Sequence, residues 1–177
     1  MTHIDAAIEL IIPDNTAFTV LIALHQLGYE QLTKVERSEH VILTVSQEEK
    51  PEDVMTALSR AEVLFNPNKH QLSYAVEGTT QPARPPEFEA FVRDVDENND
   101  RLVALLSGTF GMRTLRGLER SVAWRLHEHS GPASRERLEW ACQALLANPI
   151  SQAYDIRPRP VRRRVGELSG ATAKASQ

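Results

Sequence analysis

Histidine and cysteine side chains in this sequence have the chemistry for metal binding or covalent catalysis. His127 and His129 are two residues apart, so on a strand they would share one face, as paired metal ligands can. No cysteine or carboxylate completes a recognisable ligand set beside them, and a solvated strand face is the alternative. Cys142 and His25 fall among apolar residues of expected helices, whereas a nucleophilic thiolate needs exposure and a nearby base. We therefore expect no catalytic residue, metal site or cofactor site.

Two short motifs occur twice. Glu36-Arg37-Ser38 returns 83 residues later as Glu119-Arg120-Ser121, and Asn66-Pro67 returns as Asn148-Pro149. The first motif is either a polar turn kept after duplication or a symmetric pair of contact points for a partner or a phosphate. The second ends a helix, because a residue before proline resists the α conformation, and it could also shape a partner surface. These residues are our candidate partner contacts.

Composition excludes several classes of protein. The net charge is −4, but residues 1–80 hold 5 basic and 12 acidic side chains, a net of −7, while residues 151–177 hold 6 and 2, a net of +4. An acidic body argues against a broad nucleic-acid surface, so only the arginine-rich tail leaves an RNA-associated role open. We find no apolar run long enough to span a membrane and no signal-peptide pattern, and we expect a cytoplasmic protein.

The elements that would carry these residues follow the same order in both halves. Hydrophobic spacing and helix-end signals predict a strand, a helix, a two-stranded hairpin, a second helix and a last strand. In the first half these are residues 7–12, 15–27, 31–38 with 39–45, 51–65 and 71–76. In the second half they are residues 88–95, 98–107, 114–120 with 122–129, 133–147 and 152–156.

This order, βαββαβ, is typical of a ferredoxin-like sandwich, an antiparallel sheet with helices on one face. We predict an α+β protein with two such units in tandem. The units span residues 1–76 and 87–156, joined by a Gly/Thr/Pro linker at 77–86, and a largely disordered basic tail follows at 157–177.

The sequence resembles the PurS family in two stretches. Residues 23–30, leading to 41–45, are similar to the first helix and hairpin of that family. Residues 142–150, with Leu-Ala-Asn-Pro, and the Tyr154-containing strand are similar to its closing helix and strand. The chain departs from the family by holding two units and by having Ile12-Pro13-Asp14-Asn15 and Val95-Asp96-Glu97-Asn98 in place of the family's Lys-Pro-Gly loop.

The resemblance implies a non-catalytic bridging subunit of a formylglycinamide ribonucleotide amidotransferase in purine biosynthesis, an ATP-dependent glutamine-using ligase. Its partners would be a PurL-like synthetase and a PurQ-like glutaminase, with self-association and without a membrane or a nucleic acid. The alternative is a tandem ferredoxin-like regulatory protein that senses a small molecule.

Overall fold

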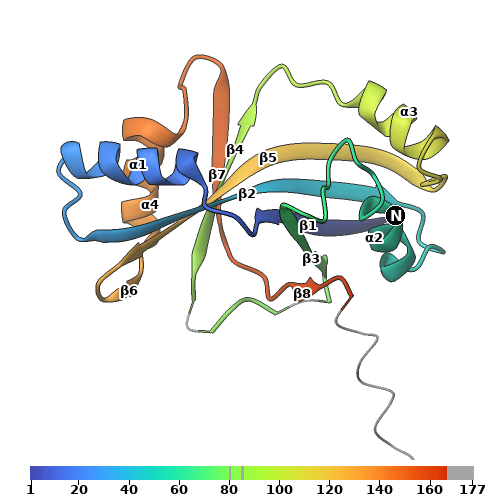
Figure 1. Ribbon diagram of the computed structural model, residues 1–177, viewed down its shortest axis with the longest axis horizontal. Helices are drawn as coiled ribbons and strands as arrows, with labels where there is room; N and C mark the ends of the chain where they lie inside the picture. Colours follow the sequence, from blue (N-terminus) through green and yellow to red (C-terminus); the bar gives the residue numbers. More distant parts are fainter. Residues whose placement is uncertain (80, 85, 167–177) are drawn as a thin grey trace, which may run out of the picture.

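The computed structural model describes residues 1–79, 81–84 and 86–166, which form an α+β protein built on one antiparallel sheet. The sheet has eight strands, in the order β7-β4-β5-β2-β1-β3-β8, with the short β6 paired to β5. Four α-helices accompany the sheet (Figure 1).

The helices and strands alternate along each half of the chain. The first half forms β1 (Thr2–Leu10), α1 (Asn15–Gln26), β2 (Leu32–Val45), α2 (Pro51–Leu58) and β3 (His70–Val76). The second half forms β4 (Phe88–Asp94), α3 (Asp100–Gly108), β5 (Leu115–Glu128), β6 (Gly131–Pro132), α4 (Arg135–Ala141) with a π-helical turn (Cys142–Leu146), β7 (Gln152–Pro158) and β8 (Arg163–Arg164).

The helix ends follow the signals in the sequence. Asp14 caps α1, since its Oδ1 accepts hydrogen bonds from the backbone N–H groups of Thr16 and Ala17 at 2.9 and 3.1 Å. Gly28 follows this helix with φ 100°, a conformation that favours glycine. Pro51 occupies the first turn of α2, where its missing N–H costs no helical hydrogen bond.

The two predicted hairpins are wrong. Residues 32–45 form one continuous strand, β2, and residues 115–128 form another, β5. The expected turns at Ser38 and Ser121 contain serine but no glycine, proline, asparagine or aspartate, which favour a tight turn more strongly than serine does. Each strand therefore runs on and pairs with the other strand, from Leu32 opposite Glu128 to Val45 opposite Leu115.

An approximate twofold relation is centred on the β2–β5 pair. Glu39 lies opposite Val122, and these residues are 83 positions apart, the same shift that superposes the two Glu-Arg-Ser copies. The strand order is symmetric about this point, with β1 and β3 on one side and β4 and β7 on the other. The sequence repeat thus has a counterpart in the architecture.

Two hydrophobic cores lie on one face of the sheet and each combines both halves of the chain. Val41 belongs to the first core and Val35 to the second, and residues six apart on a strand point to the same face. The first core joins buried side chains of α2 to Leu106 of α3, and the second joins Leu24 of α1 to Leu138 of α4. Both predicted units, 1–76 and 87–156, therefore contribute to both cores.

The first part of the basic tail is ordered, contrary to our expectation. Residues 157–158 complete β7, and Arg163–Arg164 form β8 beside β3. Arg162 lies between these two segments with its side chain nearly buried, and the carboxylates of Asp5 and Glu89 bind its guanidinium. The described part of the linker pairs with this segment through a bridge between Pro82 and Pro160. The rest of the predicted tail, 167–177, lies outside the described residues.

Candidate functional site

The first Glu-Arg-Ser copy lies beside a cleft between β2 and the start of α1. The cleft has a volume of about 460 Å³, and Glu36 and Arg37 line it. Arg37 Nε lies 3.0 Å from Oδ2 of Asp14, the residue that caps α1. Burial alone would raise the pKa of Asp14, but the hydrogen bond from Arg37 and those from the helix backbone outweigh it and lower the pKa.

The second copy lies in the equivalent position beside α3. This cleft has a volume of about 860 Å³, and Glu119 and Arg120 line it. Arg120 reaches Glu97 and Glu39 at 3.6 Å each, and Glu97 precedes α3 as Asp14 precedes α1. The structure thus places the recurring motif in two related clefts on different elements. It does not bring the two copies together into one site.

The two glutamates of the motif have different surroundings. Glu36 accepts a hydrogen bond from His127 Nε2 at 2.7 Å and one from Lys34 at 2.7 Å, with Arg125 3.6 Å away. The hydrogen bond from His127 is the main reason that the pKa of Glu36 falls far below its usual range. Glu119 lines the cleft beside α3 and also a separate cavity, which lies on the side of the sheet without helices.

Three side chains in contact, those of Asp5, His40 and Ser121, cross the helix-free face at the centre of the molecule, and His40 among them is buried. Ser121 Oγ is hydrogen bonded to His40 Nδ1 at 2.9 Å, and His40 Nε2 lies 3.0 Å from Asp5 Oδ2. Three strands supply these residues, and His40 is 1% exposed. Hydrolytic use of such side chains needs N–H donors free to hold an oxyanion, but these residues stand in paired strand interiors. We interpret the three side chains as a structural network.

A network of ion pairs lies beside the Asp5, His40 and Ser121 side chains. Arg162 donates to both carboxylate oxygens of Glu89 and to Oδ1 of Asp5, the last at 2.6 Å. Burial alone would raise the pKa of Asp5, but contact with His40 and Arg162 outweighs it and lowers the pKa to about 2. In the same way, burial opposes the charged form of Arg162, but Glu89 and Asp5 raise its pKa above the usual value.

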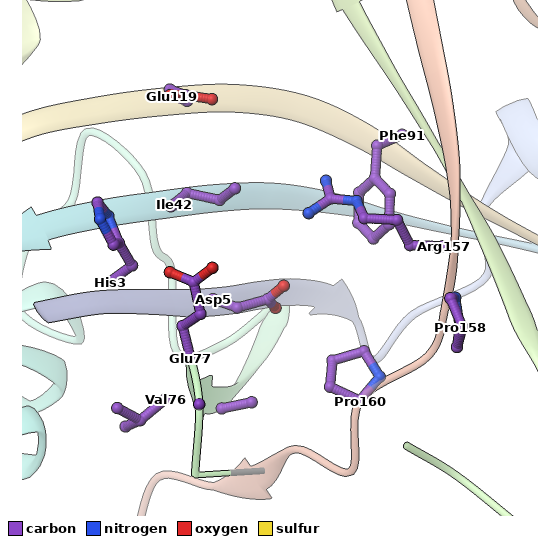
Figure 2. Close-up of a pocket in the computed structure, with 12 residues that line it drawn as sticks. His3, Asp5, Ile42, Val76, Glu77, Phe91, Glu119, Arg157, Pro158 and Pro160 are labelled. Atoms are coloured by element: carbon purple, nitrogen blue, oxygen red, sulfur yellow. The ribbon is translucent and has the colours of Figure 1, made fainter. Parts of the chain in front are cut away.

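The cavity that Glu119 lines on the helix-free face, which we call the helix-free cavity, opens beside this network. It has a volume of about 420 Å³, and its charged lining residues are His3, Asp5, Glu77, Glu119 and Arg157. Figure 2 shows the Arg157 guanidinium extending past Phe91 toward the space that the Asp5 carboxylate also faces. The guanidinium carbon lies 4.2 Å from the centre of the Phe91 ring. Arg157, whose Nε lies 2.8 Å from Asp155, is thus on one side of the cavity, and the carboxylates of Asp5 and Glu77 are on the other.

The two Asn-Pro motifs form the same turn. Asn66 Oδ1 accepts from the N–H two residues later at 2.9 Å, and Asn148 Oδ1 does so at the same distance. In each turn the backbone N–H of the asparagine donates to a side chain four residues later, His70 Nδ1 or Gln152 Oε1. These contacts explain both asparagines as local turn residues, and Pro67 and Pro149 follow them directly.

The other sequence candidates have ordinary structural surroundings. Cys142 is buried, which raises the pKa of its thiol to about 12. His25 Nε2 lies 2.6 Å from the carbonyl oxygen of Leu32. His127 is bound to Glu36, and His129 is exposed. Within residues 1–79, 81–84 and 86–166, no three His, Cys, Asp or Glu side chains are arranged to hold a metal ion.

Sequence reasoning missed the residues of the buried networks, namely Asp5, His40, Glu89 and Arg162. His40 offered one signal, because it interrupts an apolar strand end with a polar side chain that must find a partner if buried. Its partners lie on strands far away in sequence, so their identity depends on the strand register.

The described residues form an α+β protein with one antiparallel sheet, and the two Glu-Arg-Ser copies line two clefts at equivalent positions. No protein-family model matches the chain, and a comparison with curated proteins finds no relative. Among the helices of the described residues, none has the length and apolar character to cross a membrane.

Proposed function

We propose that this chain is a non-catalytic assembly protein made of two fused ferredoxin-like units that have exchanged a helix and the following half-strand. In this interpretation one unit contains β3, β1, the second half of β2 and the first half of β5, covered by α2 and α3. The other contains β7, β4, the second half of β5 and the first half of β2, covered by α4 and α1. Each unit then has the four strands and two helices of a ferredoxin-like sandwich.

The observation that supports this proposal most directly is the pairing of β2 with β5, in which Glu39 faces its own repeat equivalent, Val122. A single chain with this register resembles a dimer whose subunits have been joined. It offers two related clefts that have diverged in sequence, and two different clefts on one rigid sheet suit a protein that holds two different partners.

The resemblance to PurS suggests the partners. We propose a PurL-like synthetase and a PurQ-like glutaminase of the purine amidotransferase, in the cytoplasm, with the Glu-Arg-Ser copies among the contacts. A pull-down of the intact chain from its native host, with glutamine, ADP and magnesium, should recover both subunits by mass spectrometry. If neither subunit is recovered from cells that express both, the proposed role in purine biosynthesis is refuted.

The helix-free cavity favours a second candidate, the sensing of a small molecule. The Arg157 guanidinium and the Glu77 carboxylate, on different sides of the cavity, suit a dipolar ligand such as an amino acid. A panel of free amino acids, tested without any protein partner, should then contain one that raises the melting temperature. Arg157→Ala should abolish that rise, and a panel without effect would remove this candidate.

A further inference from the structure

The first half of β2 has an open outer edge. β1 pairs with β2 from Val45 back to Ser38, and within the described residues no strand lies against Leu32–Arg37 on that side. Figure 1 shows β2 continuing past the end of β1 toward the region of α1. Backbone N–H and C=O groups on such an edge are available to pair with another extended chain.

This edge forms one wall of the cleft beside α1. Five consecutive residues of β2, Thr33 to Arg37, line the cleft on one side. The rest of the lining combines an apolar part, which is Leu10, Pro13, Ala17, Phe18 and Leu21, with the polar side chains of Glu9, Asp14, Gln71 and Arg125. Phe18 is 62% exposed, so its ring is accessible to a ligand in the cleft. We call this cleft the β2 groove.

The equivalent cleft beside α3 shows that the apolar wall is particular to the β2 groove. There the first half of β5, Arg116 to Arg120, pairs with β2 on one side. Within the described residues no strand lies against its other side, because β4 pairs with β5 only at residues 122–124. The opposite side, however, is mainly polar, with Asp94, Glu97, Asn98, Asn99 and Asp100. The two edges are thus alike in backbone geometry and different in the side chains that they would accept.

The outer end strands of the sheet are less suited to accept a strand. β3 is already paired with β8. β7 presents Asp155 and Arg157 and ends at Pro158, and charges and proline discourage pairing at an edge. The β2 groove combines an open edge with an apolar wall, and this combination fits an extended peptide.

We propose that the β2 groove binds an extended segment of a partner protein as an added strand. The segment pairs with the backbone of residues 33–37, because the N–H and C=O groups of Leu32 are already bound to Tyr29 and His25. Its alternate side chains point to opposite faces of the sheet. Those on the helix side are apolar and pack on Phe18 and Leu21, while those on the helix-free side are polar and meet Lys34 and Glu36. This inference rests on the proposed assembly function, since it names the surface that holds one partner.

A displayed library of random peptides, selected on the intact chain, provides the probe. Selected peptides should alternate apolar and polar residues, and a bound synthetic copy should slow hydrogen exchange at amides within residues 33–37. Phe18→Asp should weaken binding by about tenfold or more, since it removes the aromatic contact and places a charge on the apolar wall. Ile150→Asp is the matched control because Ile150 is 91% exposed and lies outside the groove, and it should leave affinity unchanged.

Three results of the peptide experiments would overturn the proposal: selection yields no binder, the bound peptide protects another region, or Phe18→Asp binds as tightly as the original chain. Circular dichroism of Phe18→Asp should show an intact fold, and the Ile150→Asp control shows that an added surface charge alone has no effect. The pull-down with Phe18→Asp separates this proposal from the proposed function. Retention of both subunits by the variant would refute the groove alone, whereas peptide binding without either subunit would refute the purine role alone.

Discussion

Arg162 donates hydrogen bonds from Nη1 and Nη2 to the two carboxylate oxygens of Glu89, at 2.9 and 2.8 Å. The side chains are only 4% and 1% exposed, and the residues lie on the C-terminal segment and on β4. Such a parallel pair of charge-assisted bonds fixes both distance and orientation. The contact therefore fastens the C-terminal segment to the helix-free face, where Asp5 of β1 completes the site.

Removal of Arg162 should strongly destabilise the protein. Arg162→Ala leaves the buried carboxylate of Glu89 without its main partner, and an uncompensated buried charge typically costs about 3–5 kcal/mol of unfolding free energy. Urea denaturation measures the loss. Arg163→Ala is the neighbouring control, because Arg163 is half exposed in its pair with Glu52, and it should cost under about 1 kcal/mol. Equal losses for the two variants would refute the assigned role of Arg162.

Stability should fall in acid as Asp5 takes up a proton. Its pKa is about 2 in the folded protein and 3.8 in the reference state, so the unfolded chain binds this proton first. The contribution is therefore complete above about pH 4 and is lost as the pH falls toward 2, with a size of about 2 kcal/mol. Unfolding free energies measured across this range should depend less on pH in Asp5→Asn. Asp155→Asn, a change at a half-exposed carboxylate, serves as control, and an equal flattening there would contradict the assignment.

The packing of α3 in the core that it shares with α2 can be tested at two neighbouring leucines. Leu106 of α3 is fully buried in the core that it shares with α2, so Leu106→Ala should cost about 2–5 kcal/mol of unfolding free energy. Leu105 is 39% exposed, and Leu105→Ala should cost much less. Thermal or urea denaturation compares them, and a reversed order would mean that α3 packs through its other face.

Cys142 should be unreactive in the folded protein. Burial raises the pKa of its thiol to about 12, so almost no thiolate exists at neutral pH. An aromatic disulfide reagent should label the native chain slowly and the urea-unfolded chain at the rate of an ordinary thiol. Rapid labelling of the native protein would show that this helix is not packed as described.

Local patterns in the sequence determined most helices and strands. Asp14 and Gly28 delimit α1, Pro51 starts α2, and both Asn-Pro turns follow from short-range hydrogen bonds that neighbouring residues supply. The sequence also shows the repeat, because the two Glu-Arg-Ser copies lie 83 positions apart. The helix ends and the Asn-Pro turns depend on contacts within a few residues.

Tertiary structure alone decided how the repeats combine. A polar stretch such as Arg37-Ser38-Glu39 is compatible with a turn or a continued strand, and pairing along β5 selects the strand. Because each strand continues, α1 packs with α4 and α3 packs with α2. The same pairing brings Asp5, His40 and Ser121 together from three strands. These contacts join residues far apart in the chain, so their free energy depends on strand register and packing, which local sequence does not specify.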